Sequence, residues 1–332
     1  VLVVISGLLG AGDIKQAQDA AHTSVALYAL MHAVMTVLGL LFVPQILRLV
    51  QTPAAAMPEA KRYLYTVFAG TVFTFGYNLI GALQRGLGNA AASMSFVIIS
   101  SAANIALDAV FIVWLGMGAF GAALGTVLSQ VAAFVIGTVQ FARGGAALRL
   151  SARAVRFHKK HLKNILLFGV PTALNEVMVN LAMLTVSGVA NSFGLASSAA
   201  YGVGSRINSL AIFTDGAMNQ TMSAYASQNI GAGRQKRALE GLWKAIILSA
   251  GAALGTSLLV LGFASEFSAC FDSDPAVIEQ SAAFLRVTVW SYPLFATVGP
   301  LIGFIRGTGN VEASLLVGVV AQLCCRVPAS FL

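Results

Sequence analysis

Long apolar stretches alternate with short polar breaks along almost the whole chain. A helix that crosses a bilayer needs ~20 mostly apolar residues. Such stretches are too long and alternate too little for barrel strands, and lipid offers backbone groups no water partner. The pattern therefore predicts an all-α polytopic membrane protein with about nine complete spans. The predicted spans lie at about 24–50, 63–85, 91–115, 118–142, 163–190, 199–228, 242–264, 281–305 and 311–332.

Composition excludes the other broad classes of protein. The 332 residues are 58% hydrophobic and 10% charged, and the mean hydropathy is +0.82. A soluble domain carries ~25% charged residues, and a disordered chain has a much lower apolar content. The three cysteines, Cys270, Cys324 and Cys325, match no disulfide or metal-ligand spacing.

The basic residues gather in alternate loops, which predicts the orientation. The intervening loops carry only Arg48, Lys61 and Arg62, and the loop near residue 270 is acidic. The positive-inside rule places the basic set in the cytoplasm. The net charge of +8 therefore reflects topology and does not indicate a nucleic-acid partner. The basic set is Lys15, Arg85, Arg143, Arg149, Arg153, Arg156, Lys159, Lys160, Lys163, Arg234, Lys236, Arg237, Lys244 and Arg306.

Two short motifs recur at a single offset of 221 positions. Leu-Gly-Ala-Gly at 9–12 returns as Ile-Gly-Ala-Gly at 230–233, and Arg-Gly-Leu-Gly-Asn at 85–89 returns as Arg-Gly-Thr-Gly-Asn at 306–310. Both copies lie on the predicted cytoplasmic side, so the repeat holds an even number of spans and the halves are parallel. The repeat predicts two parallel six-helix lobes. One whole helix and most of a second are expected ahead of this chain, and one helix after it.

The repeat also predicts the domain organisation. The N-terminal lobe is expected at 1–143, a basic cytoplasmic linker at 144–162, and the C-terminal lobe at 163–332. Bases of the linker, such as Arg149 and Arg153, recur at helical spacing. Two interpretations of the linker stay open: a helix lying on the anionic inner leaflet, or a plain cytoplasmic connection.

Three acids, Asp108, Glu176 and Asp215, lie deep inside apolar spans. An ionised side chain at the bilayer centre costs ~2.5–3.5 kcal/mol on insertion scales, so such residues usually face a cavity or a partner. Asn104 precedes Asp108 by one helical turn on the same face. Carboxylate and amide oxygens suit Na⁺ or a held proton, and the alternative is hydrogen bonding between helices. The spans hold no reactive constellation of an enzyme, and no cofactor is indicated.

The motifs together resemble those of the MATE (multidrug and toxic compound extrusion) transporters. They are Ser-Gln-Asn-Ile-Gly-Ala-Gly at 227–233, the two Arg-Gly-x-Gly-Asn turns, Asn-Ile-Ala-Leu-Asp at 104–108 and Gly-Ala-Phe-Gly-Ala-Ala at 118–123. The resemblance implies a monomeric antiporter in a bacterial inner (plasma) membrane, with a central cavity and alternating access. Such a protein exports amphipathic or cationic organic compounds and is driven by Na⁺ or H⁺. Its partners are the small substrates and the lipid bilayer.

The resemblance is closer to the DinF-like branch of the family, which implies a cation site in the N-terminal lobe. Asn104 and Asp108 match the pair on the fifth helix, Asn78 stands on the fourth and Thr126 on the sixth. The site's acid on the first helix lies outside this chain. No structural metal is implied, and Na⁺ or a proton is the expected occupant at Asp108.

The C-terminal lobe contributes the expected substrate cavity. Glu176 and Asp215 occupy its first two spans, where Met178 and Met218 add adaptable apolar surface and Arg206 adds charge. The alternatives are an ion pair of either acid with Arg206, and ordinary packing for the methionines.

The alternative function is a flippase for lipid-linked oligosaccharide precursors, from the same wider superfamily. Such a protein needs a basic cavity for pyrophosphate. The candidates for that cavity are Arg206, Arg286 and Arg326.

Labelling of Cys270 tests the predicted topology, because this cysteine stands in the acidic loop that is expected to be external. A membrane-impermeant thiol reagent added outside intact cells should label it. Labelling that appears only after the membrane is permeabilised contradicts the topology.

Overall fold

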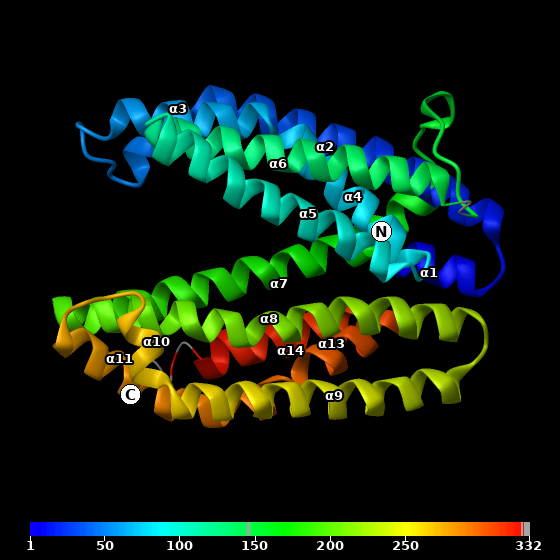
Figure 1. Cartoon of the computed structure of the whole chain (residues 1–332). Helices are drawn as coiled ribbons and strands as arrows, with labels where there is room; N and C mark the ends of the chain where they lie inside the picture. The colour runs from blue at the N-terminus through cyan, green and yellow to red at the C-terminus, as the bar shows by residue number, and fades with distance from the viewer. Residues whose placement is uncertain (145–146, 327, 329–332) are drawn as a thin grey trace. The chain divides into compact units, whose positions relative to one another are not determined.

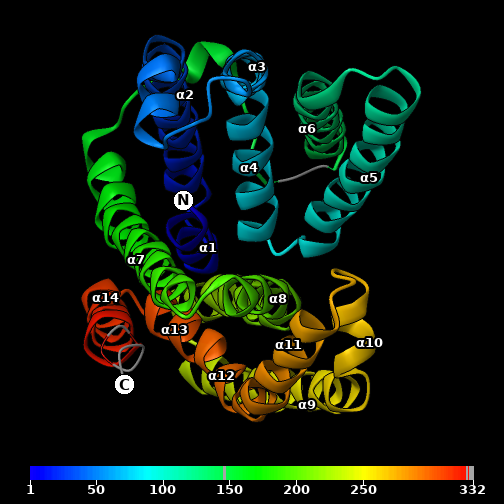
Figure 2. The ribbon, with the colours of Figure 1, turned by 90° about the vertical axis from the view of Figure 1, so that its left-hand side faces the viewer.

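The computed structural model describes residues 1–144, 147–326 and 328 (Figures 1 and 2). The side chains of residues 152, 195, 196, 210–213, 322, 325 and 326 lie outside this description. All regular elements of the described residues are helices, as predicted. The chain divides into two compact units. The first unit comprises Val1–Leu9 and Asp13–Ile165. The second unit comprises Gly10–Gly12 and Leu166–Leu332.

The first unit packs its helices around α6. Helices α3, α4 and α5 all contact α6, while α2 contacts α3 and α4. The buried ring of Phe96 lies where α5 meets α6, close to Gly137. The elements are α1 (Leu2–Gly10), α2 (Ile14–Leu49), α3 (Met57–Ala69), α4 (Thr71–Gly86), α5 (Ala90–Asp108), a π-helix (Ala109–Trp114), α6 (Gly118–Arg143) and a 3₁₀ turn (Ala152–Ala154).

The second unit packs its helices around α8, which contacts α9, α11 and α13. Its apolar core includes Val203, Val260 and Leu285. The elements are α7 (Lys159–Ser192), α8 (Leu195–Gly231), α9 (Gln235–Gly262), α10 (Ala264–Ala269), α11 (Pro275–Thr288), a 3₁₀ turn (Val289–Ser291), α12 (Tyr292–Phe295), α13 (Val298–Gly307), α14 (Val311–Val319) and a π-helix (Val320–Arg326).

Large apolar side chains cover the outside of the helices. Ile105 and Ile247 are 72% and 70% exposed, as expected for residues that face lipid and not water. Within the described residues, six helical segments are long and apolar enough to cross a membrane, or up to seven if the bent pair α3–α4 is one span. The chain is therefore a multi-pass membrane protein.

Two predicted spans are broken, although the sequence pattern favoured single helices over 63–85 and 281–305. Helices α3 and α4 meet at 45° on either side of Gly70, where an added Cβ would stand 2.4 Å from Val127 Cγ2 of α6. The second break is a 3₁₀ turn at Val289–Ser291, at the corresponding position of the repeat, inside a segment, Pro275–Gly307, that is still long and apolar enough to be one span. Pro171, in contrast, lies inside an unbroken α7.

The two copies of each repeated motif fold alike. Gly12 and Gly233 both adopt a positive φ, of 77° and 72°, which reverses the chain after α1 and α8. Asn89 and Asn310 each begin a helix by accepting a hydrogen bond from the backbone three residues ahead, at 3.1 Å in both copies. The offset found in the sequence is therefore a repeat of local structure.

Helix α13 lies against α8 along a stripe of glycines at 299, 303 and 307. A Cβ at Gly303 would stand 2.3 Å from the carbonyl oxygen of Asn219 on α8. Such close approach of two backbones is the usual mode of helix association in lipid, where burial of apolar surface provides no driving force.

We expect Gly303→Ala to lower thermal stability, because the new methyl group forces α13 away from α8. The cost should be about 1–3 kcal/mol, as for an overpacked core. Gly251→Ala on the exposed face of α9 is the matched control, since no atom lies within 4 Å of its Cβ position. It should be neutral or stabilising, because alanine favours helix more than glycine. Thermal unfolding of the full-length protein in detergent measures both; equal midpoints would contradict the close packing.

Candidate functional site

The acid–amide pair predicted on the fifth helix sits at its end. Asp108 is the last residue of α5, and the chain continues directly into the π-helix Ala109–Trp114. Leu115 N donates to Val110 O at 3.0 Å, five residues back, which is the π-type bond. A π-helical turn is uncommon and frequently marks a functional position.

Asp108 and Asn104 each carry a buried polar atom that has no hydrogen-bond partner among the described residues. These atoms are Asp108 Oδ1 and Asn104 Nδ2, which stand one helical turn apart. Buried polar groups are normally paired, so each unpaired one needs a physical explanation. Asp108 is paired with no base in the described part of the chain.

Gly125 of α6 makes room for the Asp108 carboxylate. A Cβ at this position would stand 2.3 Å from Asp108 Oδ1, so the oxygen rests against the α6 backbone. The site is thus formed by the α5–α6 contact, and the sequence alone did not identify Gly125. Its only signal was its position next to Thr126.

Asn78 and Thr126 stand on α4 and α6, and α4 packs on α6 as α5 does. Asn78 is exposed on α4 and donates through Nδ2 to Thr74 O at 2.8 Å. Thr126 is half-buried on α6 directly after Gly125. Among the described contacts, no hydrogen bond joins either side chain to Asp108, so their membership of the site stays a prediction.

The acids of the second unit have partners. Asp215 Oδ1 accepts from Gly299 N at 2.6 Å, and Asn219, one turn later, accepts from Arg306 Nη1 at 3.3 Å. Glu176 is exposed on α7 and interacts electrostatically with Arg306. Neither ion pair of the described residues joins Glu176 or Asp215 to Arg206.

Reasoning from the sequence missed three polar residues of the second unit: Asn175, Asn219 and Arg306. Asn175 Oδ1 is buried without a partner in the described structure and lies against Gly318 of α14. From the sequence, Arg306 was assigned to a repeated turn and to the basic cytoplasmic set, and not to a site. The spacing of Asp215 and Asn219 equals that of Asn104 and Asp108, a signal that was present in the sequence.

The remaining predicted residues are spread over the second unit. Met178 and Met218 are half-buried on α7 and α8. Arg206 is exposed on α8, and Arg286 is exposed on α11, where it donates to Ser265 Oγ at 3.5 Å. The side chain of Arg326 lies outside the described residues.

Comparisons with known proteins agree on one family. A family model described as MatE matches residues 1–110 and 171–332. The probable multidrug resistance protein YpnP of Bacillus subtilis (strain 168) is 26% identical over 327 residues, which cover 98% of this chain and 73% of the relative. The multidrug export protein MepA of Staphylococcus aureus (strain MRSA252) is 24% identical over 321 residues, or 95% and 71%.

Solved structures share the fold. An outward-facing multidrug resistance MATE family transporter of the MOP superfamily superposes with a TM-score of 0.93 at 23% identity, over 98% of this chain and 73% of that one. A MOP superfamily transporter from Pyrococcus furiosus gives 0.93 at 24% identity, over 99% and 74%.

Proposed function

Because the chain belongs to the MatE family of transporters, we propose that it exports amphipathic or cationic organic compounds in exchange for Na⁺ or H⁺ at Asp108. Members of this family are secondary transporters, not enzymes. The relatives named multidrug resistance and multidrug export proteins support the drug-export part of the proposal. The inner membrane of a bacterium is the proposed location, and a monomer the proposed functional form.

The observation that carries the coupling site is the unpaired, buried carboxylate oxygen of Asp108. An ionised oxygen in this position lacks the partner that low-dielectric surroundings demand. A bound Na⁺ or a bound proton supplies that partner. Asp215 of the second unit differs, since its Oδ1 already accepts a backbone N–H.

Asn104 fits either occupant. Rotation of its amide group exchanges nitrogen and oxygen, so that the oxygen turns into the buried position now held by Nδ2. That oxygen is then a hard ligand for Na⁺, or an acceptor for the hydroxyl of a protonated Asp108. The oxygens of Asn78 and Thr126 are the proposed further ligands.

Neutralisation of Asp108 gives a physical route from the cation to the substrate. The ionised form favours an arrangement in which water reaches Oδ1, and the neutral form favours the packed α5–α6 contact. The two occupancy states therefore favour different packings of the first unit. Export follows if the substrate binds one packing more tightly than the other, because a ligand shifts an equilibrium only through differential affinity.

We expect Asp108→Asn in the full-length protein to reduce gradient-driven export to background. The substitution keeps the size of the side chain and its capacity for hydrogen bonding but removes its charge. Asn78→Ala and Thr126→Ala should lose part of the activity, about 5- to 150-fold, because each removes one neutral ligand worth ~1–3 kcal/mol. Efflux of a fluorescent cationic drug from intact cells, or its uptake into inverted vesicles, measures all three at equal protein levels.

Glu176→Gln is the control for this experiment, because it neutralises an exposed acid of the other unit. It should retain gradient-driven export, with changes confined to substrate affinity. Normal export by Asp108→Asn together with loss of export by Glu176→Gln would place the coupling acid in the second unit and overturn the proposal.

A further inference from the structure

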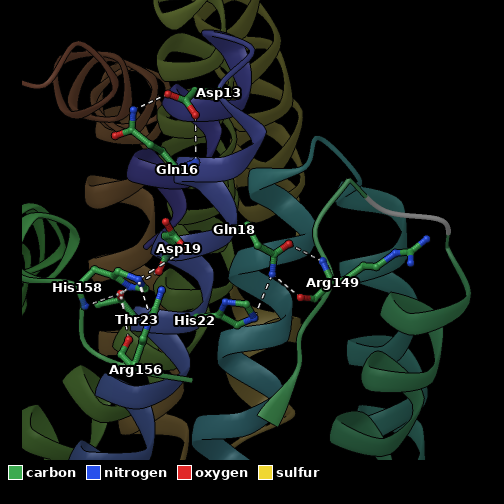
Figure 3. Close-up of polar contacts among 9 residues, drawn as sticks. All are labelled: Asp13, Gln16, Gln18, Asp19, His22, Thr23, Arg149, Arg156 and His158. Atoms are coloured by element: carbon green, nitrogen blue, oxygen red, sulfur yellow. Dashed lines mark hydrogen bonds and ion pairs between the residues drawn. The ribbon is translucent and has the colours of Figure 1, made fainter. Parts of the chain in front are cut away.

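The basic segment, residues 147–163, is fastened to the first three turns of α2 (Figure 3). Gln18 accepts from Arg149 N at 2.7 Å and donates to Arg149 O. Thr23 Oγ1 accepts from His158 N at 3.2 Å, and Asp19 Oδ1 lies 3.7 Å from His158 Nε2. These contacts therefore hold the segment in a defined position against α2.

Several of these contacts use backbone atoms of the segment, while the side chains of His158 and Lys160 also contact α2. Arg149 is held through its N–H and C=O, and its guanidinium points away from α2 in Figure 3. The carbonyl oxygen of Arg156 accepts from Thr23 Oγ1 at 3.4 Å, and its Nε donates to His158 Nε2 at 3.0 Å within the segment. The exposed bases of the segment are Arg149, Arg153, Arg156, Lys159, Lys160 and Lys163.

The charge of these bases is not balanced locally. The sequence carries no acid between residues 144 and 175. The facing acids are Asp13 and Asp19 at the start of α2, which are two carboxylates against the six exposed bases. Asp13 caps α2: hydrogen bonds from Gln16 hold its pKa below the usual range, so it is ionised at neutral pH and counts as one negative charge. Most of the positive charge of the segment is left for an external partner.

An exposed aromatic ring stands among the bases. Phe157 is 47% exposed, between Arg156 and His158. The segment joins the end of α6, at Arg143, to the start of α7, at Lys159. Both helices are apolar enough to span a membrane, so their connection lies at the membrane boundary. An apolar ring surrounded by bases at that depth suits the headgroup region, where a ring enters lipid while cations stay with phosphates.

We propose that the basic segment binds anionic phospholipid headgroups of the membrane in which the protein is embedded, with Phe157 inserted between them. This docking surface belongs to the first unit and does not depend on the transport activity. The bases recognise the lipid phosphate, and Phe157 contacts the acyl chain next to it. A soluble anion can pair with the bases but provides no apolar contact for Phe157.

The test uses purified, delipidated full-length protein with native cysteines replaced by serine and with Ser151→Cys labelled by an environment-sensitive fluorophore. Ser151 is exposed within the segment, and the substitution is nearly isosteric. Titration with phosphatidylglycerol should shift the emission to the blue and raise the midpoint of thermal unfolding. Phosphatidylcholine at the same concentration should shift neither, and inorganic phosphate should leave the emission unchanged.

Two variants separate charge from the aromatic ring. Arg149→Gln with Arg153→Gln and Lys159→Gln removes three bases whose side chains take no part in the docking on α2. It should weaken phosphatidylglycerol binding by roughly ten- to a hundred-fold, given the usual contribution of a base near an anionic surface. Phe157→Ser should keep the preference for phosphatidylglycerol but lose most of the blue shift.

The matched control removes three exposed bases near the start of α9, by Lys236→Gln, Arg237→Gln and Lys244→Gln. It should bind phosphatidylglycerol at the segment as the unsubstituted protein does. The proposal is overturned if phosphatidylcholine gives the same response as phosphatidylglycerol. It is also overturned if the control weakens the response as much as the segment variant, or if inorganic phosphate reproduces the emission shift.

Discussion

The apolar phase around the chain is the constraint from which the rest of the structure follows. Lipid gives backbone N–H and C=O groups no partner, so the described spans form helices and satisfy these groups internally. Lipid also removes the usual advantage of burying apolar side chains, and helices associate through close contact instead. The approach of Gly303 to the backbone of Asn219 is one result. In the same surroundings a polar atom without a hydrogen-bond partner has a high free energy. The unpaired Asp108 Oδ1 therefore needs a physical explanation.

Features that depend on a short piece of sequence were predictable. The spans follow from the length of apolar runs, and the turns at 9–12 and 85–89 follow from glycine and asparagine at fixed positions. The break at Gly70 was not predictable, because it depends on Val127 from another helix. Helix α2 begins at Ile14, ten residues before the apolar stretch, since its polar first turns bind the basic segment. Hydropathy indicates which residues contact lipid, and it does not indicate that the polar first turns of α2 pack against the basic segment.

The candidate site was likewise predictable only where it depends on a short piece of sequence. The four-residue spacing of Asn104 and Asp108 was visible in the sequence, since one helix face is a local property. The space provided by Gly125 was not, because it exists only where α5 meets α6. The partners of Asp215 and Glu176 likewise come from α13, far along the chain. The two units thus differ in a way that composition does not show: the buried acid of the first has an unpaired oxygen, and Asp215 of the second is held by a backbone N–H.

The most direct measurement is the stability of the purified full-length protein as a function of Na⁺ concentration and pH. A cation that binds only the folded protein raises stability in proportion to the logarithm of its concentration above Kd. We predict that added Na⁺, or added protons if H⁺ is the coupling ion, raises the midpoint of thermal unfolding of the unsubstituted protein. Asp108→Asn should remove this dependence, whereas Glu176→Gln should keep it. An unchanged dependence in Asp108→Asn would contradict the assignment of Asp108 as the cation site.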